Sequence, residues 1–275
     1  MDNQAENITV RRFSFNQATD VNDQVAIEEP MEIQLAWSTA NGRSQKNIAV
    51  TMRTPGSEKE LALGFLFTEG IIKEYSAVED ISLVSNDRNR ILVTLKEDIF
   101  PELKNAQRNF YSTSSCGICG KASIDAIQID PAYDETGEAF FIKAKLLYSL
   151  PSLLKKEQAV FENTGGLHAC ALFDSIGRLI QLNEDVGRHN ALDKVIGAAL
   201  LKGKIPLSGN ILLLSGRASF ELIQKAAMAG IKIVAAVGAP SSLAIELAKE
   251  VNITLAGFVR EDRCNLYAGY HRVQL

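Results

Sequence analysis

Two short, nearly uninterrupted apolar runs in the second half of the chain constrain its fold most strongly. They are residues 210–214 (Asn-Ile-Leu-Leu-Leu) and 231–237 (Ile-Lys-Ile-Val-Ala-Ala-Val). Strands of this kind are typical of a sheet whose two faces are both covered. Segments with helical periodicity, 219–229 and 241–250, follow these runs, and a further apolar strand is expected at 253–259. The alternation predicts a mainly parallel sheet in a three-layer α/β domain.

The rest of the second half fits the same domain. A helix closed by Gly165-Gly166 is followed by two strands and a second helix. These elements are expected at 146–162 (helix), 168–174 and 178–183 (strands) and 188–202 (helix).

The first half is expected to contain short strands around one helix. The helix is apolar almost all round, which indicates that it is buried. Ser57 and Glu60 have the spacing of a capping box at its start, and Gly70 is expected to end it. The elements are strands at 45–53, 79–84 and 89–96 and a helix at 58–68.

Periodicity is lost between Phe100 and Tyr133. Small and polar residues there flank Cys116 and Cys119, a C-x-x-C pair, so we expect a flexible functional loop over about 105–135. The chain is therefore expected to divide into an α+β N-terminal domain, 1–140, which ends in this loop, and an α/β domain, 141–275.

The composition is that of an ordinary globular protein, with 46% hydrophobic and 23% charged residues in 275. The net charge of −4 argues against a dedicated nucleic-acid binder, which needs a basic surplus. The first seven residues are polar and acidic, and the most apolar run, 231–240, is too short to cross a membrane. We therefore expect a cytoplasmic protein with no nucleic-acid or membrane partner.

A C-x-x-C pair in a reducing compartment indicates metal binding or thiol chemistry. A closed zinc site needs four ligands, and no second C-x-x-C or C-x-x-H is present, so a zinc site stays an unsupported alternative. A thioredoxin-like site is disfavoured because polar residues, not an apolar strand, precede Cys116. A nucleophilic thiol on a mobile loop suits a carrier that accepts sulfur as a persulfide and delivers it elsewhere.

Polar segments follow the expected strands of the second half. Residues 183–190 and 215–219 each stand between a strand and a helix, where open α/β sheets bind ligands and anions. His168 begins a strand as His-Ala-Cys, which lacks the glutamate of the H-x-E signature of zinc deaminases. After the last apolar strand, Arg260 and Arg263 stand near Phe258 and can grip a phosphorylated aromatic ligand, although a solvated turn is the alternative.

Several segments, taken in order along nearly the whole chain, resemble one family, the formate dehydrogenase accessory sulfurtransferases (FdhD/NarQ). The segments that carry the resemblance are Glu29–Ile33, Met52–Gly56, Glu60–Leu66, Thr68–Ile72, Ser115–Ser123, Thr164–His168, Glu184–Lys194, Ser215–Glu221 and Ala239–Ala244.

The resemblance implies a homodimeric sulfurtransferase that takes sulfur from a cysteine desulfurase and passes it to the molybdenum bis(guanine dinucleotide) cofactor, which is then inserted into formate dehydrogenase. It implies that Cys116 carries the persulfide, that Cys119 assists, and that the C-terminal domain is cytidine-deaminase-like without a metal of its own. The segment that it implies contacts the cofactor consists of Phe258, Val259, Arg260, Glu261, Asp262 and Arg263.

Two features depart from the family pattern. Glu261-Asp262 replaces a glycine-containing turn and weakens phosphate affinity there, and Cys170 and Cys264 are interpreted as small hydrophobic residues. Two other functions stay open at this point: a chaperone that binds the cofactor without moving sulfur, and a zinc-dependent nucleoside hydrolase.

Overall fold

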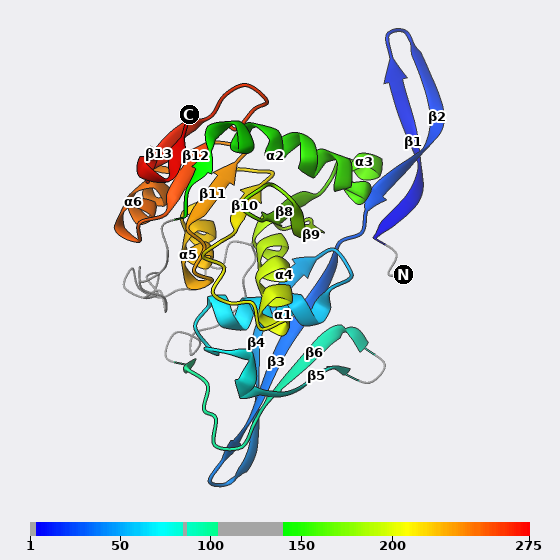
Figure 1. Cartoon of the computed structure of the whole chain (residues 1–275). Helices are drawn as coiled ribbons and strands as arrows, with labels where there is room; N and C mark the ends of the chain where they lie inside the picture. Colours follow the sequence, from blue (N-terminus) through cyan, green and yellow to red (C-terminus); the bar gives the residue numbers. More distant parts are fainter. Residues whose placement is uncertain (1–3, 85–86, 104–139) are drawn as a thin grey trace.

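A computed structural model describes residues 4–84, 87–103 and 140–275 (Figure 1). In this part of the chain each half contains its own sheet, and helices are stacked between the two sheets. A separate two-stranded hairpin projects from the body.

The sheet of the second half has six strands. In spatial order they are β13 (Asn265–Ala268), β12 (Thr254–Gly257), β11 (Ile233–Ala236), β10 (Ile211–Leu214), β8 (His168–Phe173) and β9 (Leu179–Asp185). The central strands β10, β11 and β12 are parallel, and α5 (Phe220–Met228) and α6 (Ser242–Glu250) connect them. The alternation of strands and helices expected over this region is therefore confirmed.

The expectation of a mainly parallel sheet is wrong. β8 is antiparallel to both β9 and β10, and β13 is antiparallel to β12. The connections explain the difference, because a parallel return needs a crossover of about a dozen residues or more. A tight turn in which Asp174 N donates to Arg178 O at 3.0 Å joins β8 to β9, and the short segment 258–264 joins β12 to β13.

Both faces of this sheet are covered. Ala171 and Phe173 of β8 belong to a core that includes α2 (Ala144–Glu157). The alternate residues, Cys170 and Leu172, belong to a second core on the other face, with α4 (Arg188–Leu201), α5 and α6. This arrangement confirms the three-layer α/β class of the second half.

The first half contains a four-stranded sheet. In spatial order its strands are β4 (Gly42–Arg53), β3 (Glu29–Thr39), β6 (Asp87–Leu95) and β5 (Val78–Val84). β3 is antiparallel to β4 and parallel to β6, and the helical turn η1 (Tyr75–Ala77) precedes β5. Three of these strands match the expected ranges; β3 was not expected.

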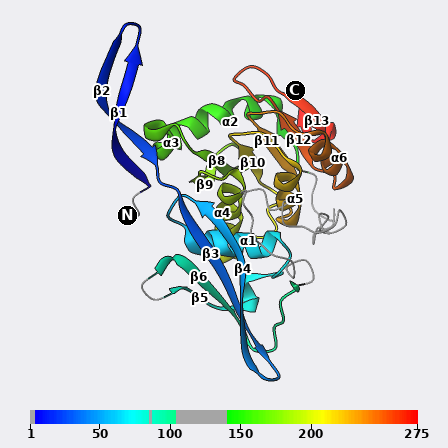
Figure 2. The same cartoon turned by 180° about the vertical axis from the view of Figure 1, so that it is seen from behind.

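The helix α1 (Glu58–Thr68) has the expected bounds and is buried between this sheet and α4 (Figure 2). α1 and α4 touch main chain to main chain: a Cβ added at Gly64 would lie 1.9 Å from Asp193 O, and one added at Gly197 would lie 1.9 Å from Glu60 O. One continuous hydrophobic core therefore joins the two halves.

The start of α1 differs from the expected capping box. Ser57 has a left-handed backbone (φ 59°) and makes no capping hydrogen bond through its side chain. Its Oγ instead accepts from Asn183 Nδ2 at 3.3 Å, while Glu58 Oε1 accepts from Gly56 N at 2.7 Å. A contact from the other half of the chain therefore engages the hydroxyl oxygen that was expected to cap the helix. Gly70, with φ 70°, follows the end of the helix as expected.

The helix expected at 146–162 is divided into α2 and α3 (Ala159–Thr164). Glu184 of β9 causes the second start, because its carboxylate accepts from the backbone N–H groups of Val160 (3.2 Å) and Phe161 (3.0 Å). This acceptor is distant in sequence, so local periodicity does not reveal the break.

Two further strand pairs were not expected from the sequence. β1 (Ala5–Ser14) and β2 (Gln17–Ala26) form the projecting hairpin. β14 (Val273–Gln274), which follows the helical turn η4 (Tyr270–Arg272), pairs with β7 (Ile142–Lys143). Within the described ranges no helix is both long and apolar enough to cross a membrane. The domain boundary expected near residue 140 stays a prediction, since residues 104–139 are outside the description.

Candidate functional site

The carboxyl ends of β10, β11 and β12 meet at one edge of the C-terminal sheet, which we call the carboxyl edge. Three turns there are tied together through their backbones: Gly238 N donates to Gly216 O at 2.9 Å, and Phe258 N donates to Gly238 O at 3.1 Å. Gly238 is packed so closely that an added Cβ would lie 2.9 Å from the backbone of Arg217. In α/β sheets such an edge is where ligands bind.

The tail turn, Phe258–Arg263, follows β12 at this edge. Phe258 has a positive φ of 51° and is 43% exposed, whereas Val259 is fully buried and anchors the turn. Arg260 Nη1 donates to Val237 O and to Val259 O, both at 2.8 Å. The guanidinium of Arg260 therefore links the turn after β11 to the turn after β12.

Five of the six residues predicted to contact the cofactor line one cavity of about 450 Å³. The sixth, Phe258, lies beside it in the same turn. The lining residues are Pro151, Ser152, Lys155, Val237, Val259, Arg260, Glu261, Asp262 and Arg263. The contribution of α2 was missed by sequence reasoning, because the helix was expected but nothing local indicated which turn it packs on.

The acidic pair that departs from the family pattern is partly engaged inside this cavity. Glu261 Oε1 accepts from Ser152 Oγ at 2.8 Å, and Asp262 lies 3.6 Å from the guanidinium of Arg263. That exposed ion pair contributes little to stability. Lys155 has no acidic partner among the described residues, so the cavity keeps a cation available for an anionic ligand.

A basic group, which consists of His168, Arg188 and Arg217, lies further along the carboxyl edge. Gly216 gives the imidazole room, because a Cβ there would lie 3.2 Å from His168 Nδ1. Burial lowers the pKa of His168 below its ordinary value, and the nearby charges of Arg188 and Arg217 lower it further. Arg188 Nε is buried and makes no hydrogen bond in the part of the chain that the structure describes.

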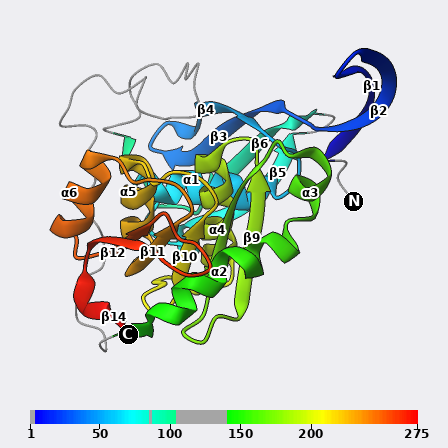
Figure 3. The ribbon, with the colours of Figure 1, turned by 90° about the horizontal axis from the view of Figure 1, so that it is seen from above.

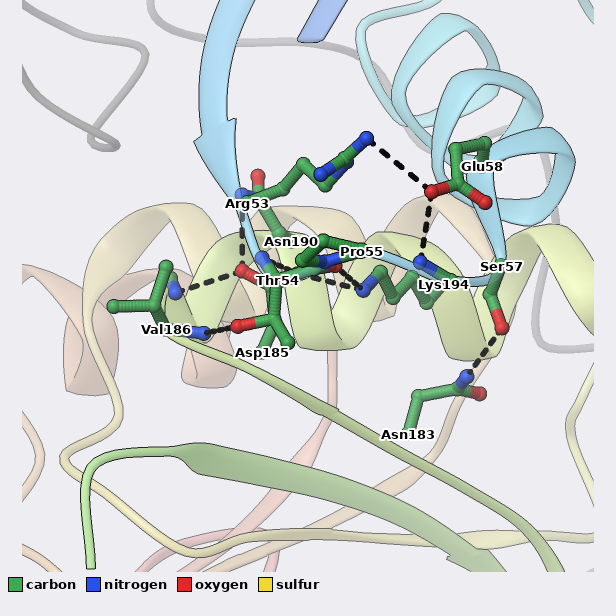
Figure 4. Close-up of polar contacts among 12 residues, drawn as sticks. Arg53, Thr54, Pro55, Ser57, Glu58, Asn183, Asp185, Val186, Asn190 and Lys194 are labelled. Carbon is green, nitrogen blue, oxygen red and sulfur yellow. Dashed lines mark hydrogen bonds and ion pairs between the residues drawn. The ribbon is translucent and has the colours of Figure 1, made fainter. Parts of the chain in front are cut away.

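Asp185, in the same polar segment as Arg188, contacts the residues that follow β4 in the first half of the chain (Figure 4). It is fully buried, lies 2.7 Å from Lys194 Nζ, and accepts from Thr54 N at 3.2 Å. Lys194 Nζ also donates to Thr54 O at 2.8 Å, and Asn190 Nδ2 donates to Met52 O at 2.7 Å. We call these side chains the interface network, because they hold the segment after β4 against the start of α4.

The buried arginine Arg53 extends this network into the first half. Its guanidinium lies 3.2 Å from Glu29 and 3.3 Å from Glu58, and it donates to Asn89 Oδ1 at 3.0 Å. Within the polar segment 183–190, the carboxylate of Asp185 is therefore used between the halves and is not available to a ligand.

A sequence model of the FdhD/NarQ family matches residues 26–274. The chain belongs to the FdhD/NarQ family. Among its relatives is the sulfur carrier protein FdhD of Streptomyces avermitilis, 48% identical over 263 residues that cover 92% of this chain and 90% of the relative. The sulfur carrier protein FdhD of Sulfolobus acidocaldarius is 43% identical over 253 residues, which cover 92% of both chains. The suspected family membership is thus confirmed.

The fold has a counterpart in the crystal structure of a protein assigned as a formate dehydrogenase accessory protein from Desulfotalea psychrophila. The two chains are 25% identical, with a TM-score of 0.77 over 99% of this chain and 100% of the other. The likeness therefore extends over both halves.

The predicted catalytic residues, Cys116 and Cys119, lie outside the described residues. The described chain ends on one side at Leu103, which packs on the core shared by the halves, and resumes at Phe140, which packs on the core beneath α2. Cys170 is buried, and burial raises the pKa of its thiol, so it is a small core residue and not a nucleophile. Cys264 is half-buried and packs on the core with α2.

Proposed function

We propose that this protein is a cytoplasmic sulfurtransferase that serves formate dehydrogenase, with Cys116 as the persulfide carrier and Cys119 as its assistant. The molybdenum bis(guanine dinucleotide) cofactor is its substrate. The observation that carries the proposal is the cavity at the tail turn, where residues assigned to cofactor contact from the sequence gather around one concave site. Family membership and the sulfur-carrier names of the relatives support the sulfur chemistry.

The first step loads the carrier. The thiolate of Cys116 attacks the outer sulfur of a cysteine persulfide on the desulfurase. A bond forms between that sulfur and Cys116 Sγ, the sulfur–sulfur bond of the donor breaks, and the donor cysteine leaves as a thiolate.

The second step unloads it. The thiolate of Cys119 attacks Cys116 Sγ and forms a disulfide, and the outer sulfur leaves as hydrosulfide to become a ligand of the substrate's molybdenum. A thiol reductant then supplies two electrons and two protons to restore both thiols.

The carboxyl edge suits the nucleotide parts of this substrate. The tail cavity has the size of a small-molecule site and presents Lys155 and the exposed ring of Phe258 nearby. The basic group adds two guanidinium groups that have no acidic partner among the described residues, as a pyrophosphate requires. We assign the tail cavity and the basic group to the guanine nucleotide ends, and the expected partners remain the cysteine desulfurase, formate dehydrogenase and a second copy of the chain.

Intact-mass analysis after incubation with a cysteine desulfurase and cysteine tests the sulfur transfer. We expect one added sulfur per chain that dithiothreitol removes, and none in Cys116→Ala. Cys264→Ser is the matched control, because it removes a thiol outside the pair and should load normally. Absence of added sulfur in the unaltered protein, together with nucleotide binding, would instead establish the non-catalytic chaperone; stoichiometric zinc would revive the hydrolase.

A further inference from the structure

The cavity at the tail turn is lined by charges of both signs. Lys155 and Arg263 attract phosphate groups, whereas the acidic pair that departs from the family pattern, Glu261 and Asp262, repels them. A ligand that fills this cavity must therefore offer hydrogen-bond donors to a carboxylate and must carry its anionic groups at another end. Phosphate affinity alone does not account for such a lining.

Glu261 is oriented by the helix α2. Ser152 Oγ donates to Glu261 Oε1 at 2.8 Å, and both residues line the cavity. Figure 3 shows the helix that supplies this contact: α2 lies on one face of the C-terminal sheet, and α4, α5 and α6 lie on the other. Glu261 Oε2 makes no hydrogen bond or ion pair within the described ranges, so one oxygen is fixed and the other is available.

Asp262 differs from Glu261 although it is its neighbour. Its side chain is 73% exposed, and it lies 3.6 Å from the guanidinium of Arg263, which is equally exposed. An exposed pair of this kind leaves both side chains mobile. A carboxylate that is already held in place loses less conformational freedom when it binds a ligand, so Glu261 is the better acceptor of the two.

The hydrogen-bonding groups of guanine match a fixed carboxylate. A carboxylate accepts through two oxygens and donates nothing, and each oxygen can accept more than one hydrogen bond. Guanine presents N1–H and the N2 amino group side by side on its Watson–Crick edge, so one carboxylate accepts from both. Adenine presents the lone pair of N1 beside its amino group, and that lone pair would face the carboxylate. The carboxylate therefore distinguishes the two purines.

Phe258 supplies the second part of a base site. Its ring is 43% exposed and belongs to the same turn as Glu261. Bases stack on exposed aromatic rings, and stacking tolerates every base because each has a π face. Stacking on Phe258 would therefore add affinity without selecting the base, and the selection would come from the carboxylate.

We propose that Glu261 is the residue that selects guanine. Its carboxylate accepts from N1–H and from the N2 amino group of one guanine end of the substrate, the base stacks on Phe258, and the phosphates point away from the acidic pair. This inference rests on the proposed function, because it takes the guanine dinucleotide cofactor as the substrate. It adds the residue that determines which base the tail cavity accepts.

Isothermal titration calorimetry of the full chain with three nucleoside diphosphates tests the proposal. The unaltered protein should bind guanosine diphosphate at least about tenfold more tightly than adenosine diphosphate, because adenine loses a charge-assisted hydrogen bond. Glu261→Gln should weaken guanosine diphosphate about tenfold and strengthen xanthosine diphosphate, whose C2 oxygen accepts from the glutamine amide. A general loosening of the turn would not reverse the preference between bases.

The matched control is Asp262→Asn. It removes the same charge one residue away, at an exposed side chain of the same turn, and should keep the preference for guanine. Phe258→Leu should weaken guanosine and adenosine diphosphates by equal factors, since it removes stacking alone. Circular dichroism of the three variants shows whether the fold is kept, as the exposure of these side chains leads us to expect.

Three results would overturn the proposal: equal affinities of the unaltered protein for guanosine and adenosine diphosphates, an unchanged preference in Glu261→Gln, or the same reversal in Asp262→Asn. If none of the three nucleotides binds, the assignment of the nucleotide ends to the carboxyl edge fails together with it. Persulfide loading is measured without any nucleotide, so failure of the sulfur-transfer proposal would be seen independently.

Discussion

The junction of β9 and α4 carries two polar groups that differ in their hydrogen-bond partners. Asp185 and Asn190 point inward, are buried, and have their partners in the interface network. Arg188, two residues earlier than Asn190, belongs to the basic group at the carboxyl edge, and its Nε has no hydrogen-bond partner among the described residues. One short stretch of sequence therefore contributes both to a structural cluster and to the group that we propose binds a ligand.

The difference teaches that the number of internal partners distinguishes these roles better than residue type does. A buried charge costs several kcal/mol unless it is paired and hydrogen-bonded, and the interface network meets that requirement. The basic group keeps its hydrogen-bonding capacity for something outside the described chain. Substitutions in the first cluster should change stability, and substitutions in the second should change binding.

The largest expected effect is on stability. Lys194→Ala should leave the carboxylate of Asp185 buried without its cation and lower the free energy of unfolding by about 3–5 kcal/mol. Urea denaturation measures it. Lys202→Ala is the control, because Lys202 follows α4 and its side chain is exposed. It should change the free energy of unfolding by less than about 0.5 kcal/mol. If the two variants lost similar free energies of unfolding, the interface network would not be a stabilising cluster.

The second effect tests the helix contact that supports the interface network. Gly64→Ala forces α1 and α4 apart, because the added Cβ would lie 1.9 Å from Asp193 O, and should cost about 2–3 kcal/mol. Gly209→Ala is the control, since nothing lies within 4 Å of a Cβ there. Thermal unfolding that shows no difference between the two would mean that the helices separate easily.

The third effect is on binding. Arg188→Ala and Arg217→Ala should each weaken the affinity for guanosine diphosphate about tenfold, because each removes a charge-assisted contact, while unfolding changes by less than about 0.5 kcal/mol. Isothermal titration calorimetry measures the affinity. Arg43→Ala, at an exposed ion pair of the first half, should bind normally. A stability loss without a binding loss would place these arginines with the structural cluster.

The smallest effect concerns pH. Because the pKa of His168 is lowered in the folded state, the unfolded chain takes up the proton first as the pH falls below the ordinary value of 6.5. The free energy of unfolding should therefore decrease between pH 6.5 and the lower native pKa, and His168→Gln should remove this contribution. A phosphate ligand beside the imidazole should raise its pKa, which NMR titration of the ring detects; an unchanged pKa would separate His168 from the ligand.

Local patterns predicted well where one element is decided by its own residues. α1 was found because it is apolar all round, and β10, β11 and β12 because their runs are apolar and separated by helices. The antiparallel strands at the two edges of the C-terminal sheet were not predicted. The alternation of strands and helices indicated a parallel sheet, whereas the short connections to β9 and β13 require antiparallel pairing. The projecting hairpin of β1 and β2 was not predicted. Each of its strands has apolar residues at only a few positions, so the alternating pattern that indicates a strand is weak.

Contacts between distant segments set the limits of prediction. Glu184 accepts hydrogen bonds at the start of α3, Asn183 donates to Ser57 Oγ, and Thr54 N donates to Asp185. In each case the partner is distant in the sequence. Five of the six residues of the tail turn line one cavity, yet the helix that completes this cavity, with Ser152 and Lys155, could be identified only from the packing. The C-x-x-C pair lies outside the described residues, so its role rests on chemistry and family.

The crossing of α1 and α4 has a consequence for how the two halves can be exchanged among related proteins. Gly64 and Gly197 each face the main chain of the opposite helix and not a side chain. A larger residue at either position therefore cannot be accommodated by trimming its neighbour, because no neighbouring side chain is there to trim. A chimera that takes one half from a relative should work only if that relative brings its helices equally close, whatever the match in the surrounding core.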